Sequence, residues 1–247
     1  MPSKSRSYGR RRRGARMNMK GTKTEVTRKR VPRISTLNKK IKRIEDTREL
    51  KYNDVFRSAQ EVDSAGVMYL MNGIQVGDTQ ITRTGAEVQS TSLQIRGSFL
   101  TETTVNDPTV FRMIVFWDRQ ANGADPLLIS TGVGTPALLF SPASGRGVDL
   151  PFMYETQDRF RVLYDKRYVV NPLVIQTVAA GETTAVIPVE LIFKKKIKLN
   201  RRVKYDDTNG IIDDINTNSL YVAFISTNQL VNNATVTFTS RFYFKDA

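Results

Sequence analysis

Apolar and polar residues alternate over much of the chain beyond Tyr52, in short runs separated by clusters of Gly, Asn, Asp and Pro. Such a pattern is typical of β-strands that bury one face. The clearest strand covers residues 235–244, where Val236 and three phenylalanines share one face and Ser240 interrupts it. Further strands are predicted at residues 67–71, 92–101, 109–118, 160–170, 184–199 and 220–226. Pro188 is expected to divide the run at residues 184–199 into two strands, because proline cannot donate a ladder hydrogen bond.

The connections between these strands are too long and irregular for simple hairpins, which favours a Greek-key or jelly-roll sandwich over an up-and-down barrel. The sequence contains no internal repeat, so propellers and solenoids are poor candidates. The expected fold class is therefore all-β, a single jelly-roll sandwich of about eight strands. Trp117, the only tryptophan, follows Phe116 in an apolar run and is predicted to lie in the core.

A short amphipathic helix is predicted within residues 35–50. Leu37, Ile41 and Ile44 are spaced so that they share one helix face, and Ser35 or Thr36 could cap the helix start. A solvated linker helix is the alternative interpretation. The polar face, which would lie toward any bound nucleic acid, carries Lys39, Lys40, Lys42 and Arg43.

Positive charge is concentrated at the N-terminus. The 38 Lys and Arg residues outnumber the 24 Asp and Glu residues and give a formal net charge of +14. Residues 1–43 hold 17 of the cations and one acid, Glu25, whereas residues 44–247 carry a net charge of −2. Residues 2–33 cannot bury enough apolar surface to offset the entropy of ordering. We therefore predict a disordered basic arm, residues 1–43, followed by one β domain, residues 44–247.

The arm carries charge without fixed geometry, which suits phosphate neutralisation rather than recognition of base edges. The same cationic clusters could be recognised by a nuclear import receptor. A tail that only improves solubility is the alternative, although such tails seldom combine so many cations with a single acid. The residues expected to contact nucleic acid are Arg6, Arg10, Arg11, Arg12, Arg13, Arg16, Lys20, Lys23, Arg28, Lys29, Arg30, Arg33, Lys39, Lys40, Lys42 and Arg43.

A second group of cations lies at the end of the strand predicted at residues 184–199. In strand geometry Lys196 and Lys198 share one face, and Ile197 and Leu199 share the other. These cations could contact phosphate on the inner surface of an assembly, or form a solvated edge that discourages strand addition. The group consists of Lys194, Lys195, Lys196, Lys198, Arg201, Arg202 and Lys204.

The chain contains no cysteine and no histidine, which excludes disulfide scaffolds, thiol nucleophiles, Ser/His/Asp triads and the usual zinc ligands. Glu155 and Asp158 could be posed as a catalytic pair, but nothing else gathers around them, so we expect no enzymatic activity. We expect no metal or cofactor either. The acidic pairs at residues 206–207 and 213–214 do not fit a calcium-loop template and are better explained by a turn.

No apolar run is long enough to cross a bilayer, and runs in the β domain such as residues 113–117 are far shorter than a membrane span. The N-terminus lacks the apolar stretch of a secretory signal, so we expect no cleaved leader. Residues 233–235 match the glycosylation sequon, which we interpret as a chance match.

Six blocks of sequence behind the Arg-rich start resemble the coat proteins of small circular single-stranded DNA viruses, the geminivirus-like group. Each block alone is a common strand-and-turn pattern, but their order and spacing make the resemblance specific. The blocks are RTGAEVQSTSLQIRG (residues 83–97), FRMIVFWDRQANGADP (111–126), QDRFRVLYDKRYVV (157–170), FKKKIKLNRRVKYDD (193–207), NSLYVAFIS (218–226) and TSRFYFKDA (239–247).

This resemblance implies a jelly roll that assembles around single-stranded DNA, with the arm inside the shell and also serving as a nuclear localisation signal. The expected partners are single-stranded DNA, a host nuclear import receptor and other copies of the chain. The expected locations are the virion and, during assembly, the host nucleus. The smallest icosahedral shell has about sixty copies, whose arms would neutralise on the order of a thousand nucleotides.

Two other classes of protein remain open at this point. The coat protein of a small RNA satellite virus would have the same arm and the same roll. A monomeric nucleic-acid-binding protein with a basic tail would be expected to bind through its globular part, yet residues 44–247 are nearly neutral and show no platform of aromatic and basic residues.

Overall fold

The computed structural model describes residues 36–40, 48–101, 108–128, 139–140, 147–171, 173–175, 185–187, 189–227 and 234–246. The chain divides into two units, Met1–Asp46 and Thr47–Ala247. In the first unit the described residues, 36–40, are helical. The short helix predicted within residues 35–50 is confirmed for the described residues 36–40, and Leu50, the last residue of that range, begins a strand and pairs with Lys245.

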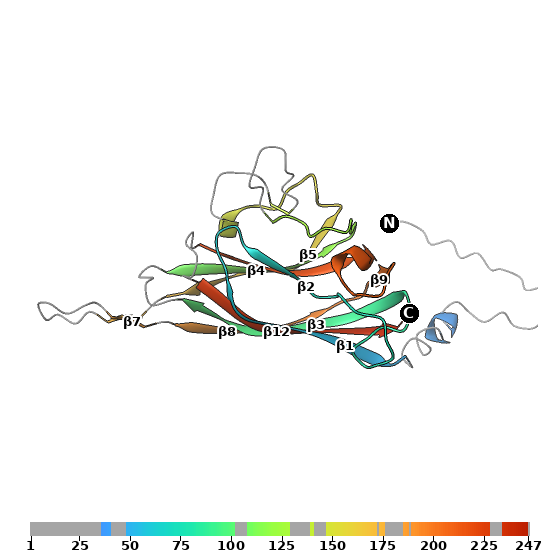
Figure 1. The fold of residues 1–247 in the computed structure, drawn as a ribbon. Helices are drawn as coiled ribbons and strands as arrows, with labels where there is room; N and C mark the ends of the chain where they lie inside the picture. Colours follow the sequence, from blue (N-terminus) through green and yellow to red (C-terminus); the bar gives the residue numbers. More distant parts are fainter. Residues whose placement is uncertain are drawn as a thin grey trace, which may run out of the picture. The chain divides into compact units, whose positions relative to one another are not determined.

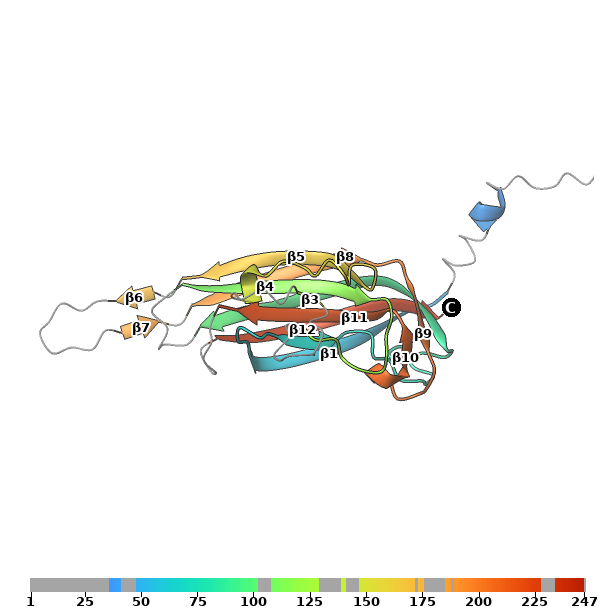
Figure 2. The same ribbon diagram turned by 90° about the horizontal axis from the view of Figure 1, so that it is seen from above.

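The second unit consists of two antiparallel sheets that pack face to face (Figure 1). The strands of the first sheet are β1 (Leu50–Glu61), β12 (Ala234–Asp246), β3 (Glu87–Thr101), β8 (Glu190–Lys198), β9 (Arg202–Tyr205) and β10 (Ile215–Thr217). The strands of the second are β2 (Val67–Leu70), β11 (Ser219–Ser226), β4 (Thr109–Asp118) and β5 (Phe160–Val170). Strands β6 (Leu173–Ile175) and β7 (Ala185–Ile187) pair only with each other among the described residues (Figure 2), and two short 3-10 turns cover Gly147–Asp149 and Ile212–Asp214.

The strand order is that of a jelly roll. In the first sheet β1 pairs with β12, β12 with β3 and β3 with β8, and in the second β2 pairs with β11, β11 with β4 and β4 with β5. These pairs involve eight strands, which in chain order are β1, β2, β3, β4, β5, β8, β11 and β12. The first of the eight therefore lies beside the last, the second beside the seventh, the third beside the sixth and the fourth beside the fifth. Successive pairs alternate between the two sheets, as in a long hairpin rolled into a sandwich.

Strand β3 is long enough to pair with two successive strands on the same side. Its residues 92–100 pair with β8, and its residues 87–89 pair with β9. Ser90 joins the connection between β8 and β9, because its hydroxyl donates to the carbonyl of Arg201 and accepts from that residue's amide. β8 and β9 thus lie end to end beside β3, and together they occupy the next position in the first sheet.

The strands predicted from alternation are confirmed, including the division of residues 184–199 into β7 and β8. Strands β1, β6, β9 and β10 were not predicted. β1 has charged or amide residues on both faces, and on the inward side only Val55 packs against the core, while Lys51 and Asn53 are held by hydrogen bonds. There Lys51 bonds Thr84 and Asp246, and Asn53 donates to the carbonyls of Met71 and Gly73.

The main core lies between the two sheets and includes Trp117, as predicted. A second apolar cluster lies on the opposite face of the second sheet, where the described part of the β4–β5 connection covers it (Figure 1). Phe116 and Tyr221 of the sheet face Phe140, Val148 and Leu150 of this cluster's outer layer. Strands β4 and β11 are therefore buried on both faces, which explains the unbroken apolar run at residues 113–117.

Gly97 is required at the centre of the first sheet. A Cβ atom built there would lie 2.2 Å from the carbonyl oxygen of Thr237 and 2.9 Å from the Phe193 ring. The Phe193 ring and the Cβ of Phe238 fill the space that a side chain would need, so the core on this side depends on glycine.

Candidate nucleic-acid interface

The face of the first sheet that points away from the core carries a group of exposed cations. The cross-strand register places Arg96 of β3 beside Lys194 of β8, and Gln94 beside Lys196. Next along the strand, Ser92 lies beside Lys198, and at the end of β3 Gln89 lies beside Arg202. We name this surface the basic face, and define it by Arg96, Lys194, Lys196, Lys198, Arg202 and Lys204, all exposed.

Most cations of the basic face have no acidic partner within the described part of the chain. Lys204 forms an ion pair with Glu87 at 3.2 Å, but no ion pair between described residues engages Arg96 or the lysines of β8. Side chains on one face of neighbouring strands lie about 5 Å apart, so these like charges repel one another. A polyanion bound across the strands would relieve that repulsion.

Five members of the cationic group predicted from sequence lie on this face, and two do not. The predicted alternation is confirmed, because Lys196 and Lys198 are exposed whereas Ile197 and Leu199 are buried. Lys195 points to the opposite side, where its Nζ lies 4.4 Å from the centre of the Tyr164 ring.

Arg201 is the other member that lies apart. Its Nη1 donates to Asn218 Oδ1 at 3.3 Å. Burial lowers the pKa of its guanidinium, and the nearby positive charges of Arg161 and Arg119 lower it further. Arg201 therefore belongs to the end of the sandwich rather than to the basic face.

Aromatic side chains lie on the same side of the sheet as these cations. Phe56 of β1 is 60% exposed and pairs in register with Thr239, the neighbour of Arg96. In the same way Tyr52 of β1 lies opposite Tyr243 of β12. The expectation that the β domain lacks a platform of aromatic and basic residues is therefore wrong. The platform joins strands distant in sequence, and only the register of β1, β12, β3 and β8 reveals it.

Arg241 links the aromatic and cationic parts of this face. It bonds both carboxylate oxygens of Asp54 at 2.7 Å, and its guanidinium lies 4.3 Å from the centre of the Tyr52 ring. The hydrogen bond to Asp54 raises the pKa of Arg241, so it remains fully charged. Around it is a shallow hollow of about 270 Å³, lined by Gln94, Arg96, Thr239, Arg241 and Tyr243.

The first described residue of the β domain lies beside the last residues of the chain. Arg48, just before β1, donates to the backbone carbonyl of Asp246 at 3.1 Å. Of the arm cations predicted to bind nucleic acid, Lys39 and Lys40 are described and both are exposed. The others lie outside the described residues.

The acidic segments considered from sequence take part in local hydrogen bonds. Asp207 Oδ1 accepts from the Thr208 amide, and Asp214 Oδ2 accepts from the Ile211 amide, so residues 206–214 form the predicted turn. Across the described ranges, no group of three or more His, Cys, Asp or Glu side chains is placed to hold a metal ion. No helix in the described ranges has the length and apolar character to span a membrane.

A jelly roll is an architecture used by viral capsid subunits, lectins and cupins, and a basic sheet face behind a basic arm favours the first of these classes. Comparison with protein families agrees: residues 2–247 match the model of the geminivirus coat protein/nuclear export factor BR1 family. The chain therefore belongs to this family and is a viral capsid protein. Membership implies a structural role as a component of the virion.

Other comparisons add little to this assignment. No curated protein matches the sequence. Among solved structures, infectious bursal disease virus (Gx strain) is similar with 9% identity and a TM-score of 0.23, covering 80% of this chain and 33% of that one. The VP2 subviral particle of infectious bursal disease virus gives 8% identity and a TM-score of 0.14, with 81% and 42% coverage. Such low scores support no inference about this protein.

Proposed function

We propose that this coat protein assembles into a small icosahedral shell and packages single-stranded DNA against its arm and its basic face. The observation that supports this most directly is the difference between the two outer faces of the sandwich. One bears cations that mostly lack an acidic partner among the described residues, on the same side as Phe56 and Tyr52, whereas the other is covered by the described part of the β4–β5 connection. A shell subunit of this kind would turn the basic face toward the nucleic acid.

The chemistry of the basic face suits a single strand. Backbone phosphates would lie along the cations of β3 and β8, while unstacked bases would lie on the aromatic rings of β1 and β12. A duplex hides its base faces and would gain only the phosphate contacts. The face is therefore expected to prefer single strands while showing little preference among sequences.

The arm would supply most of the neutralising charge. Its net charge of +16 in about sixty copies amounts to roughly a thousand charges, comparable with the same number of nucleotides. Because the released counterions dominate such binding, packaging is expected to weaken steeply as salt rises. The same clusters, Arg10–Arg13 and Arg28–Arg30, are proposed to act as the nuclear import signal.

The test is to purify particles and digest their extracted nucleic acid separately with deoxyribonuclease and ribonuclease. Digestion by the first enzyme alone supports packaging of DNA, and digestion by the second alone would favour the coat of an RNA satellite virus. In the same assay, replacing Arg10 to Arg13 by alanine is expected to leave the fold intact and reduce the packaged nucleic acid. Unchanged packaging in that variant would remove the arm from the mechanism.

A further inference from the structure

One acidic side chain lies among the cations and aromatic rings on the outward face of the first sheet. Asp54 of β1 pairs in register with Arg241 of β12, which pairs with Gln94 of β3, which pairs with Lys196 of β8. These four residues form one row across four strands. The carboxylate of Asp54 is exposed, so any polyanion that binds across the strands meets a negative charge in this row.

The charge of the face changes from one side of the sheet to the other. The two neighbouring rows, each taken from β1 to β8, are Tyr52, Tyr243, Ser92 and Lys198, and Phe56, Thr239, Arg96 and Lys194. Within the three rows β8 contributes three lysines and β3 one arginine, whereas β12 and β1 contribute one cation and one acid, which are Arg241 and Asp54. The half of the face over β8 and β3 therefore attracts phosphates, and the half over β12 and β1 offers rings without net charge.

The acid engages the one cation of the aromatic half. Both carboxylate oxygens of Asp54 accept from Arg241, one from Nε and one from Nη2, each at 2.7 Å. The guanidinium also lies 4.3 Å from the centre of the Tyr52 ring. Such bidentate pairs have a defined geometry, so Asp54 neutralises Arg241 and occupies two of its three nitrogens.

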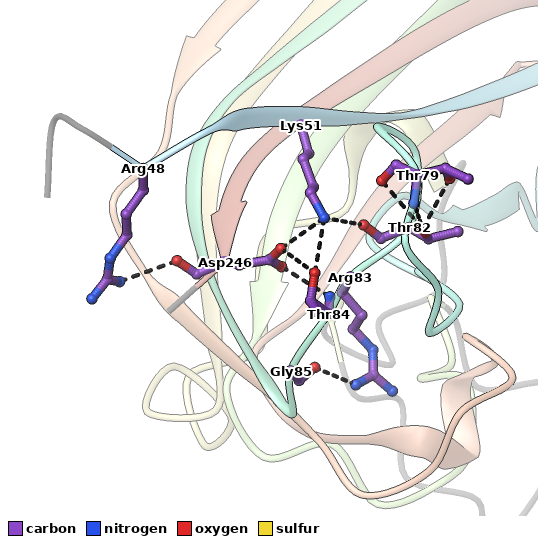
Figure 3. A network of polar contacts seen from close by, with 8 residues as sticks. All are labelled: Arg48, Lys51, Thr79, Thr82, Arg83, Thr84, Gly85 and Asp246. Carbon is purple, nitrogen blue, oxygen red and sulfur yellow. Dashed lines mark hydrogen bonds and ion pairs between the residues drawn. The ribbon is translucent and has the colours of Figure 1, made fainter.

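Contacts on the inward side of β1 keep the acid on the outward face. Lys51 forms an ion pair with Asp246 at 2.8 Å (Figure 3). Asn53 donates to two backbone carbonyls, and Val55 packs against the core. Because successive side chains of a strand point to opposite faces, these inward contacts hold Asp54 outward.

A single strand can bind this face without bringing phosphates to the acid. Its phosphates can lie over β8 and β3 while its unstacked bases lie on the rings of Tyr52 and Phe56. The carboxylate of Asp54 then lies beside uncharged bases. In this orientation the acid opposes binding only weakly, because it is separated from the phosphates by the width of the bases.

A duplex cannot avoid the acid in the same way. Its bases are stacked inside, and it presents two lines of phosphates on either side of a groove about 6–12 Å wide. Neighbouring strands of a sheet lie about 5 Å apart, so β12 is about 10 Å from β8. Phosphates held over β8 therefore place the second line near Asp54, where like charges repel. Repulsion of a competing partner is a common source of specificity.

We propose that Asp54 is a specificity-determining residue, which directs phosphates toward β8 and β3 and disfavours a duplex. The proposal rests on the proposed function, because it requires that this face bind single-stranded DNA. It adds to that function the residue that discriminates against the competing form of DNA.

The test compares the affinities of the full, unassembled chain for a labelled single strand and for the duplex of the same sequence. In Asp54→Asn the affinity for the duplex is expected to rise about ten-fold and that for the single strand about two-fold, so the preference falls about five-fold. The salt slope for the duplex should become steeper by about one, because Arg241 gains a phosphate. The arm is identical in every variant, so differences between variants report the face.

Two further variants separate this role from a general effect of charge. Asp54→Glu keeps the carboxylate and is expected to keep the preference for the single strand. Asp149→Asn makes the same change of net charge in the ion pair with Arg167, which is similarly exposed but belongs to the β4–β5 connection, and both affinities should remain those of the wild type. Because both ion pairs are exposed, all variants are expected to fold, which thermal unfolding checks.

Three results would overturn the role of Asp54 and leave the proposed function standing. They are an unchanged preference in Asp54→Asn, an equal rise in affinity for both forms of DNA, and the same loss of preference in Asp149→Asn. An unmodified chain that binds the duplex as tightly as the single strand would instead contradict the proposed function as well.

Discussion

Arg112 of β4 bonds both carboxylate oxygens of Asp165 on β5, with its Nε 2.8 Å from Oδ1 and its Nη2 2.7 Å from Oδ2. Its third nitrogen donates to the carbonyls of Val148 and Leu150, at 3.3 and 2.7 Å. The guanidinium also lies near two aromatic rings of the β4–β5 connection, 4.9 and 5.1 Å from their centroids. One buried arginine therefore fixes the connection that covers the second sheet.

Removing the acidic partner should loosen this connection. Asp165→Ala leaves a buried, uncompensated guanidinium, and we expect the free energy of unfolding to fall by about 3 kcal/mol. Urea unfolding of the full chain, at a salt concentration that keeps it unassembled, measures the change in the free energy of unfolding. Limited proteolysis should show faster cleavage within residues 147–159. The control is Asp149→Ala, whose ion pair with Arg167 is half exposed and should contribute less than about 1 kcal/mol.

The basic face should contribute to the salt dependence of DNA binding. Replacing Arg96, Lys194, Lys196 and Lys198 by alanine removes four phosphate contacts, and we expect the slope of log K against log salt to become shallower by about three. Titration of a labelled single strand with the unassembled protein at several salt concentrations measures the slope. An unchanged slope would show that the phosphates lie elsewhere.

Phe56 should contribute stacking rather than charge. Phe56→Ala is expected to weaken binding of a single strand by about 1–3 kcal/mol per stacked base, with no change in the salt slope. Because the ring is 60% exposed, the thermal stability of the protein should change little. Ile192→Ala, which truncates a 78% exposed aliphatic side chain on the same sheet, is the control and should bind as the wild type does. Equal losses in the two variants would count against stacking.

The contact between Lys51 and Asp246 should make the chain end sensitive to acid. Burial alone would raise the pKa of Asp246, but the hydrogen bonds from Lys51 and Thr84 lower it below its ordinary 3.8. The contact therefore stabilises the fold above about pH 4, and this stability is lost as pH falls through the lowered pKa. Asp246→Asn should lower stability at pH 7 by only about 1 kcal/mol, because the amide oxygen can still accept from Lys51, which also keeps its hydrogen bonds to Thr82 and Thr84. The difference from wild type should vanish near pH 2.

The sequence predicted the strands whose two faces differ in polarity, such as β12, where buried Val236 and Phe238 alternate with more accessible threonines. It did not predict β1, because Lys51 is buried through hydrogen bonds that involve residues far away in the chain. Neither could alternation alone reveal the basic face. Phe56 and Lys194 are separated by most of the domain, and they share one surface only because β12 and β3 lie between their strands.

The central claim is that copies of this chain close around single-stranded nucleic acid. The most direct test is to measure particle size by light scattering and electron microscopy on the purified protein, at low and high salt and with and without single-stranded DNA. We predict closed particles of uniform diameter that form with the DNA at low salt. A monomer of 28.0 kDa that binds the strand but never closes into particles would contradict the account.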